Sequence, residues 1–228
     1  MKVWNKIPIK ESGDKLIAIP SYFKFIEPHP YLSLGAPYQD EKQIWKLRAE
    51  VVNRLIKVND YLASKNNSFC LLIYDSWRPL EVQEFMFKKA FVLECKKLNI
   101  DTSLKDMQSY PLIIKKVEKF WAFPSFDEKC PPPHSTGGAL DVSLSDEFGN
   151  LIEMGSDIDQ MDETSKPDFY ENFDEGEAVI WNSRRNLLKE IMIKFGFVQH
   201  PNEWWHFSYG DQLWAWKNKK TNAFYGKI

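Results

Sequence analysis

Residues 134–144 read HSTGGALDVSL, and this stretch joins a histidine to the start of a strand. Its two glycines permit a tight turn close to an ion, because glycine adopts backbone conformations that other residues avoid. The residues after them alternate over 139–144 as in a strand, which directs Asp141 to one face. We therefore expect a loop histidine, His134, and a strand carboxylate, Asp141, to converge on one point.

A second short motif, near the C-terminus, supplies further ligand chemistry. Residues 203–206 read EWWH. Residues three apart on a strand face opposite ways, so Glu203 and His206 need a bulge or a bend to reach one ion. Two histidines and one carboxylate with an open fourth position suit catalytic zinc. The pattern predicts a site in which His134, Asp141 and His206 hold the metal. Glu203 is then the general base.

Each of these residues also has a simpler interpretation. The chain has only four histidines, and a histidine beside two tryptophans, such as His206, is commonly a core or surface residue. His134 follows three prolines and reads equally as an ordinary loop residue. Asp141 is harder to explain in this way, because a buried carboxylate needs a partner or a metal. His29 and His200, both next to prolines, are interpreted as structural.

Hydrophobic spacing predicts the elements that precede the first motif, after forty irregular, proline-marked residues. A long helix is expected over 40–64, ended by Asn66 and Asn67. A short apolar run over 69–74 predicts a buried strand. Pro79 suits the first position of a second helix, and a third is expected over 109–121. The apolar stripe of the second helix comprises Val82, Phe85, Met86, Ala90 and Leu93.

The second half of the chain is predicted as two hairpins that flank a long acidic loop and a helix capped by Gly196. Loops of this length are uncommon unless they are functional. The first hairpin is predicted over 139–144 and 151–152, with a turn at 146–150. The loop is predicted over 156–177, the helix over 178–195, and the closing hairpin over 197–200 and 203–209.

Length and composition indicate one domain over residues 1–228, since the chain is long for one domain and short for two. A formal net charge of -2 without a long run of one sign gives no indication of nucleic-acid or membrane binding. The first residues contain no apolar run long enough for a signal sequence. Cys70, Cys95 and Cys130 are widely spaced and read as reduced thiols. A cytoplasmic protein is therefore expected.

Three separated motifs of the chain resemble the D-alanyl-D-alanine dipeptidases of the vancomycin-resistance type, within a larger peptidase and hedgehog-like fold group. They are YDSWRP at 74–79, the stretch at 134–141 and EWWH at 203–206, and their order and separations also agree. The resemblance implies an α+β fold, with helices packed on a small, mainly antiparallel sheet that carries zinc at one end. It also implies zinc-dependent hydrolysis of a small dipeptide, D-alanyl-D-alanine, to two D-alanine molecules.

The resemblance also implies roles for individual residues. One zinc ion per chain would be held by His134, Asp141 and His206. Glu203 would act as base and then as proton donor. Arg78 would stabilise the oxyanion of the tetrahedral intermediate, whereas the sequence alone favours a helix-start arginine paired with Asp75. An aspartate that follows a Met-Gly pair would meet the substrate ammonium, with Asp159 the candidate and Asp157 its competitor.

One departure from the family pattern concerns the substrate. Pro132 stands where the family usually has serine, and it offers neither a hydroxyl nor an N–H. Thr136 occupies a position that is often basic in the family. The stereochemical preference and the oligomeric state are therefore left open. Two alternatives also stay open: a related carboxypeptidase or endopeptidase acting on longer peptidoglycan peptides, and a zinc-binding module without catalysis.

Overall fold

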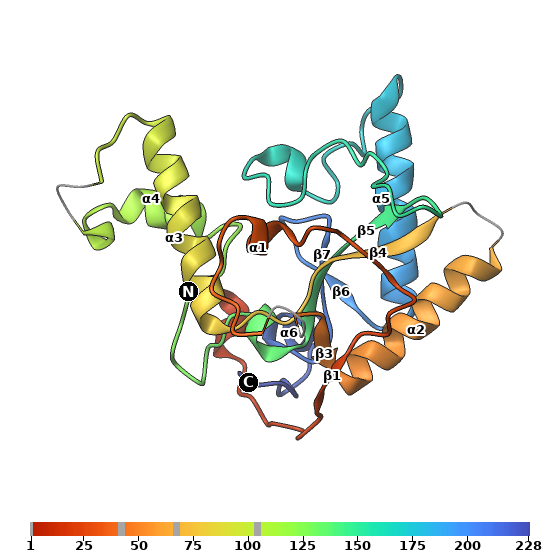
Figure 1. The fold of residues 1–228 in the computed structure, drawn as a ribbon, viewed down its shortest axis with the longest axis horizontal. Helices are drawn as coiled ribbons and strands as arrows, with labels where there is room; N and C mark the ends of the chain where they lie inside the picture. The colour runs from red at the N-terminus through yellow and green to blue at the C-terminus, as the bar shows by residue number, and fades with distance from the viewer. Residues whose placement is uncertain (1, 41–43, 66–68, 103–105) are drawn as a thin grey trace.

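A central five-stranded sheet organises the protein, as seen in a computed structural model that describes residues 2–40, 44–65, 69–102 and 106–228 (Figure 1). The strand order is β2-β4-β5-β7-β6, and only the β2–β4 pair is parallel. Helices pack on this mainly antiparallel sheet, which confirms the predicted α+β class. The strands are β2 (Lys24–Phe25), β4 (Cys70–Asp75), β5 (Ala139–Ser145), β7 (His206–Ser208) and β6 (Val198–Gln199).

The two faces of β5 differ in chemistry, as its alternating sequence predicts. Leu140, Val142 and Leu144 belong to the main hydrophobic core, together with side chains of α2 (Ala49–Ser64) and α5 (Glu177–Lys194). The alternate positions carry Asp141 and the serines that follow it, all buried. Because strand side chains alternate between faces, the apolar face fixes the register and commits Asp141 to the other face.

The predicted helix over 40–64 is wrong at its start. Lys46–Arg48 form strand β3, which pairs with β1 (Leu16–Ala18) in a small antiparallel sheet, and α2 begins only at Ala49. Leu47 lies opposite Ile17 in this sheet and is fully buried. Leu47 is thus buried as part of a paired strand and not as part of the apolar face of a helix. The expected helix end at Asn66 and Asn67 lies outside the described residues.

A second hydrophobic cluster lies on the far side of the sheet, around α3 (Leu80–Lys97) and α4 (Pro111–Val117) (Figure 1). α3 begins directly after Pro79, as predicted, whereas α4 is shorter than expected. The buried face of α3 is centred on Phe87 and Ala90 and leaves Leu93 exposed, so the predicted stripe is wrong there. Tyr31 and Trp121 complete this cluster.

The elements predicted for the second half of the chain are present, with small changes in their bounds. Residue Leu151 makes a single bridge to Ser145, so the first hairpin is shorter than expected. The loop contains one short helix, η5 (Glu163–Ser165), before α5, and β6 and β7 form the closing hairpin. The three cysteines are unpaired. Within the described ranges, no helix combines the length and apolar character needed to cross a bilayer.

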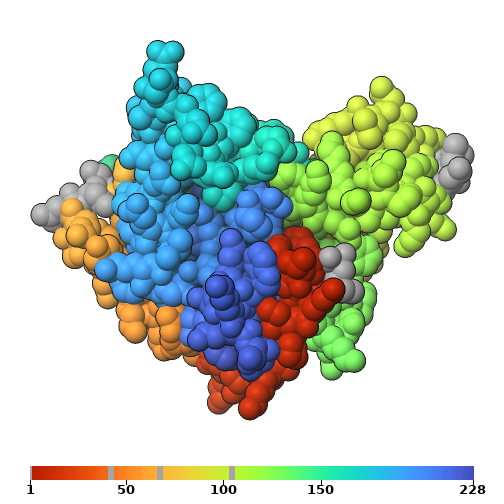
Figure 2. All heavy atoms as spheres, turned by 180° about the vertical axis from the view of Figure 1, so that it is seen from behind, coloured from red at the N-terminus to blue at the C-terminus, as the bar shows by residue number. Residues whose placement is uncertain are grey.

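The N-terminal residues pack against the C-terminal segment of the chain. Figure 2 shows this, with the red N-terminal residues lying against the blue C-terminal ones. The short helix η1 (Val3–Lys6) contacts α6 (Gln212–Lys217), and Lys10 N donates to the Ala223 carbonyl at 2.9 Å. This packing fixes the position of Lys2, which directly precedes η1.

Candidate metal centre and catalytic site

Three polar residues lie side by side across the middle of the sheet. Asp75 on β4 pairs with Asp141 on β5, which in turn pairs with His206 on β7. The register of β4 shifts between Ile73 and Asp75. A bulge of this kind turns the following side chain to the other face, so Asp75 joins Asp141 rather than the core. The sheet register therefore builds one row of the site.

His134 reaches the same point from the short helix η4 (His134–Thr136), directly before β5. Gly137 closes this helix with a φ of 70°. A Cβ on Gly138 would lie 2.6 Å from the Tyr209 carbonyl oxygen, so the close approach of the chains requires glycine there. The sequence prediction that two glycines permit this turn is confirmed. The glycines turn the chain between His134 and the strand that carries Asp141.

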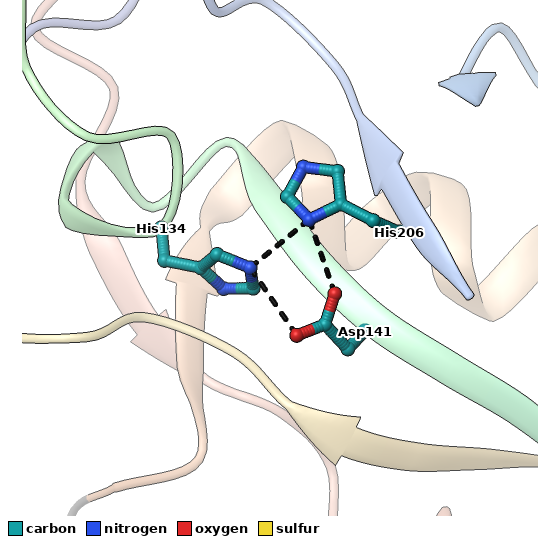
Figure 3. Close-up of side chains that lie close together, drawn as sticks. All are labelled: His134, Asp141 and His206. Carbon is teal, nitrogen blue, oxygen red and sulfur yellow. Dashed lines mark hydrogen bonds and ion pairs between the residues drawn. The ribbon is translucent and has the colours of Figure 1, made fainter. Parts of the chain in front are cut away.

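Figure 3 shows that His134, Asp141 and His206 point toward one another. His134 Nε2 lies 3.1 Å from His206 Nδ1 and 3.3 Å from Asp141 Oδ2, and His206 Nδ1 lies 3.1 Å from Asp141 Oδ1. One ligand atom from each residue lies within 4.8 Å of the other two. All three residues are buried. The predicted metal-binding set is thus brought together.

The donor set of these residues fits a zinc ion. His134 Nδ1 lies 2.8 Å from the Ser76 carbonyl and must donate to it, so Nε2 carries a lone pair. His206 Nε2 lies 3.4 Å from Ser208 Oγ, which leaves Nδ1 for the cluster. Neighbouring ligand atoms around tetrahedral zinc are about 3.3 Å apart, since its bonds are about 2.0–2.1 Å long. The three ligand atoms are therefore spaced as a tetrahedral zinc site requires.

Glu203 lies in the turn between β6 and β7 and not on the strand. β7 begins at His206, so the opposite-face problem raised by the EWWH spacing does not arise. Trp204 N donates to the Ser165 carbonyl, and Val142 N donates to the Trp205 carbonyl, which together hold this turn in place. Glu203 Oε2 then lies 3.7 Å from His206 Nδ1. Burial raises the pKa of Glu203 to about 8, within the range useful for a general base.

His200 is a member of the site that the sequence prediction missed. Its Nδ1 lies 3.2 Å from Glu203 Oε1, and its ring lies edge-on to His206 at 5.4 Å between centroids. Burial lowers the pKa of His200 well below its usual value, so the ring is neutral. The only signal in the sequence is its position three residues before Glu203 across a Pro-Asn turn. His29, by contrast, caps helix α1 (Pro30–Ser33), which agrees with the structural role expected for it.

Arg78 is both paired with Asp75 and close to the metal-binding set, so the two interpretations of this residue are compatible. It pairs with Asp75 and also extends toward Asp141, whose Oδ2 lies 3.7 Å from Nη2. Nη1 donates to Gln83 and Nη2 to the Tyr31 hydroxyl, at 2.7 and 3.2 Å. Burial alone would lower the pKa of Arg78, but Asp75, Tyr31 and Asp141 together outweigh it and raise that pKa. The guanidinium is a fixed positive charge beside the metal-binding set.

The two candidate aspartates of the 156–177 loop, Asp157 and Asp159, differ in their surroundings. Asp159 Oδ2 accepts a 2.9 Å hydrogen bond from the Tyr31 hydroxyl, while Asp157 is exposed. Asp159 has a φ of 67°, a left-handed conformation that is uncommon outside glycine and often marks functional positions. Burial and the nearby Asp141 carboxylate raise its pKa to about 7. Asp159 is therefore the one of the pair that faces the site.

One cavity of about 590 Å³ contains all of the predicted site residues. Aromatic side chains such as Trp121 and Phe123 form part of its wall, and Pro132 and Thr136 also line it. A cavity of this size is in the range of small-molecule sites. The predicted members are His134, Asp141, His206, Glu203, Arg78 and Asp159.

Comparisons with known proteins agree with this geometry. The family model described as D-ala-D-ala dipeptidase matches residues 25–224. A D-alanyl-D-alanine dipeptidase of Synechocystis sp. is 35% identical over 241 aligned residues, which cover 100% of this chain and 97% of that protein. One of Escherichia coli is 39% identical over 74 residues, covering 32% of this chain and 36% of that protein.

Among solved structures, the chain is similar to a vancomycin resistance D,D-pentapeptidase, VanY, crystallised with Zn(II). The TM-score is 0.47 at 15% identity, with 94% of this chain and 92% of that chain covered. The family match spans almost the whole chain, and the Synechocystis relative is aligned over all of it. This protein is therefore a metallopeptidase that belongs to the D-ala-D-ala dipeptidase family.

Proposed function

We propose that this protein hydrolyses D-alanyl-D-alanine to two D-alanine molecules with one zinc ion held by His134, Asp141 and His206. The observation that carries the proposal is the convergence of these three ligands with Glu203 and Arg78 in one cavity. Membership of the D-ala-D-ala dipeptidase family supports the choice of substrate. When bound, zinc supplies a Lewis acid that polarises the scissile carbonyl and makes water a stronger acid.

Glu203 is proposed as the proton carrier of the reaction. Oε1 is occupied by His200, so Oε2, which lies on the His206 side, is the oxygen that meets the attacking water. It removes a proton from this water as the new C–O bond forms. It then delivers the proton to the amide nitrogen as the C–N bond breaks, which releases the second alanine as an amine.

Arg78 is proposed to stabilise the negative charge that develops on the carbonyl oxygen. A guanidinium has five N–H donors, and four of them are used by Asp75, Gln83 and Tyr31 among the described residues. The remaining donor on Nη1 is available to the substrate. Because its partners hold the group rigidly, little reorganisation is needed as the charge forms.

Asp159 is proposed to bind the ammonium group of the substrate. Its contact with Tyr31 joins it to Arg78, and so places it beside the group that meets the carbonyl. A dipeptide bound by its ammonium presents its single peptide bond at a fixed distance from that anchor.

We further propose that the enzyme acts in the cytoplasm, because its three unpaired cysteines suit a reducing compartment.

The release of free D-alanine from D-alanyl-D-alanine tests this function directly. Purified protein, supplied with zinc, is assayed against D-alanyl-D-alanine, L-alanyl-L-alanine and a pentapeptide that ends in D-alanyl-D-alanine. We expect rapid cleavage of the first and little of the other two. Preferred release of D-alanine from the pentapeptide would favour a carboxypeptidase. Stoichiometric zinc with no cleavage of any of the three would favour a binding module.

A further inference from the structure

Lys2 places an ammonium group in the catalytic cavity without a carboxylate partner. It lines the same cavity as Glu203 and His200, and its Nζ lies 3.3 Å from His200 Nε2. The side chain is half-buried beside the Trp4 ring, whose centroid is 5.3 Å from Nζ. Within the described part of the chain, no carboxylate oxygen lies within the 4.0 Å of an ion pair with it.

This arrangement leaves Lys2 with unused capacity to bind an anion. An ammonium has three N–H donors, and its one described partner is the neutral ring of His200. Burial lowers the pKa of Lys2, against the opposing pull of the more distant Glu203 and Glu118 carboxylates. A cation withdrawn from water without a counter-ion is costly, and a ligand carboxylate would offset that cost.

The other cations of the cavity are less suited to this task. Arg78 is already paired with Asp75. Lys115 and Lys119 lie on the cavity wall but are exposed, so water solvates them. Pro132, on the same wall, has neither a hydroxyl nor an N–H with which to hold a carboxylate. Lys2 is thus the partly buried cation of the described cavity that has no carboxylate within ion-pair distance.

The charges of the cavity follow an order that matches a zwitterion. Contacts run from Asp159 through Tyr31 and Arg78 to Asp141 of the metal-binding set. They continue from His206 through Glu203 and His200 to Lys2. A carboxylate therefore stands at one end of this series and an ammonium at the other, with the metal-binding set between them. A free dipeptide carries the complementary charges at its two ends.

We propose that Lys2 binds the C-terminal carboxylate of the substrate and so restricts the enzyme to peptides that end one residue after the scissile bond. This inference rests on the proposed function, because it assigns the second end of the same substrate. It places the leaving alanine on the Glu203 side, where its nitrogen receives the proton. Lys2 is then a binding residue, contributed by a segment 132 positions before the first metal ligand.

The rival explanation is that Lys2 acts only through His200. The Lys2 ammonium lies 3.3 Å from Nε2 and so helps to hold the His200 ring, whose Nδ1 lies 3.2 Å from Glu203 Oε1. In that case Lys2 would affect every substrate equally, whether or not it has a free carboxylate. Comparison of D-alanyl-D-alanine with its C-terminal amide separates the two explanations, because the amide lacks the charge and keeps the scissile bond.

The experiment measures kcat and KM for both substrates in zinc-loaded protein that carries any tag at the C-terminus. The variants are Lys2→Met, Lys2→Arg and, as a matched control, Lys6→Met, which changes an exposed lysine of η1 outside the cavity. We expect Lys2→Met to lower kcat/KM for the free acid by about 10- to 100-fold, mainly through KM, and to leave the amide nearly unchanged. Lys2→Arg should retain part of the preference, and Lys6→Met all of it.

Equal losses for acid and amide in Lys2→Met, or an unchanged preference, would overturn the proposal. Zinc content and the thermal midpoint identify a variant that has failed to fold. If Lys2→Met fails in this way, the ratio of acid to amide cleavage in Lys2→Arg tests the proposal. If the wild type cleaves neither substrate, the proposed function has failed separately. Calorimetric binding of the two dipeptides to the Glu203→Gln protein still tests Lys2, since tighter binding of the acid must disappear with Lys2→Met.

Discussion

Glu203 Oε1 lies 3.2 Å from Nδ1 of His200, so one oxygen of the proposed base is anchored while the other faces the metal-binding set. A carboxylate on a free side chain samples many orientations, and only some of them reach the attacking water. The His200 contact limits this freedom, which is the usual benefit of a neighbour packed against a catalytic side chain.

Replacement of His200 should therefore slow the reaction without removing the metal. We expect His200→Ala to lower kcat by about tenfold, with a smaller change in KM, because the Glu203 carboxylate loses the neighbour that limits its orientation. His200→Gln keeps a polar side chain beside Glu203 and should recover part of the rate. Steady-state kinetics with zinc analysis checks this, and a loss of zinc equal to the loss of activity would show that His200 supports the metal instead.

Replacement of Glu203 should separate catalysis from metal binding. Glu203→Gln keeps the shape of the side chain but cannot take up a proton, so kcat should fall by ~10²–10⁴-fold, as for other positioned acid–base groups. Zinc content should stay at the wild-type level, because the three metal-binding residues are unchanged. Turnover within a factor of a few of the wild type would rule out Glu203 as the base.

The pH dependence of kcat/KM should reveal Asp159. Its carboxylate must be ionised to hold an ammonium, and its pKa is raised to about 7, while that of Glu203 is raised to about 8. Activity should fall as pH decreases through this region, with a log–log slope that approaches two because both groups gain a proton. A bound cation favours both ionised forms and moves the fall to lower pH.

Asp159→Asn serves as the control for that profile. The asparagine does not titrate, so the slope should approach one, and KM should be higher at every pH. A slope of two that survives in Asp159→Asn would assign the second proton to another group.

The same substitution should stabilise the metal-free protein at alkaline pH. The pKa of Asp159 is about 7 in the folded state, against about 4 in an unfolded chain. The cost of ionising it on folding is absent below pH 4, grows between pH 4 and 7 and is complete above pH 7. Asp159→Asn should thus raise the melting temperature by about 2–4 °C at pH 8 and much less at pH 4.5. Equal effects at both pH values would contradict the raised pKa.

The metal-binding set was predicted from the combination of two short motifs, although each residue alone also has a simpler interpretation. Two glycines mark the turn between His134 and the strand of Asp141, and the alternation of that strand commits Asp141 to the polar face. The helix after Pro79 and the closing hairpin were predictable from periodicity and turn chemistry, whereas the α+β class followed from the resemblance to a known family.

Features that depend on distant pairing could not be predicted from sequence. The strand at Lys46–Arg48 has apolar spacing that also suits a helix, and its partner β1 decides between the two. The shift in β4 that turns Asp75 toward Asp141 leaves no trace in composition. Lys2 and His200 are 198 positions apart, and their contact depends on the packing of η1 against α6.

The zinc content of purified wild-type and His206→Ala protein, measured together with D-alanine release, tests the central claim most directly. The account predicts one zinc ion per wild-type chain, and it predicts a loss of both zinc and activity in His206→Ala, with zinc retained in Glu203→Gln. Full zinc occupancy and turnover in His206→Ala would contradict the metal centre on which the proposed reaction depends.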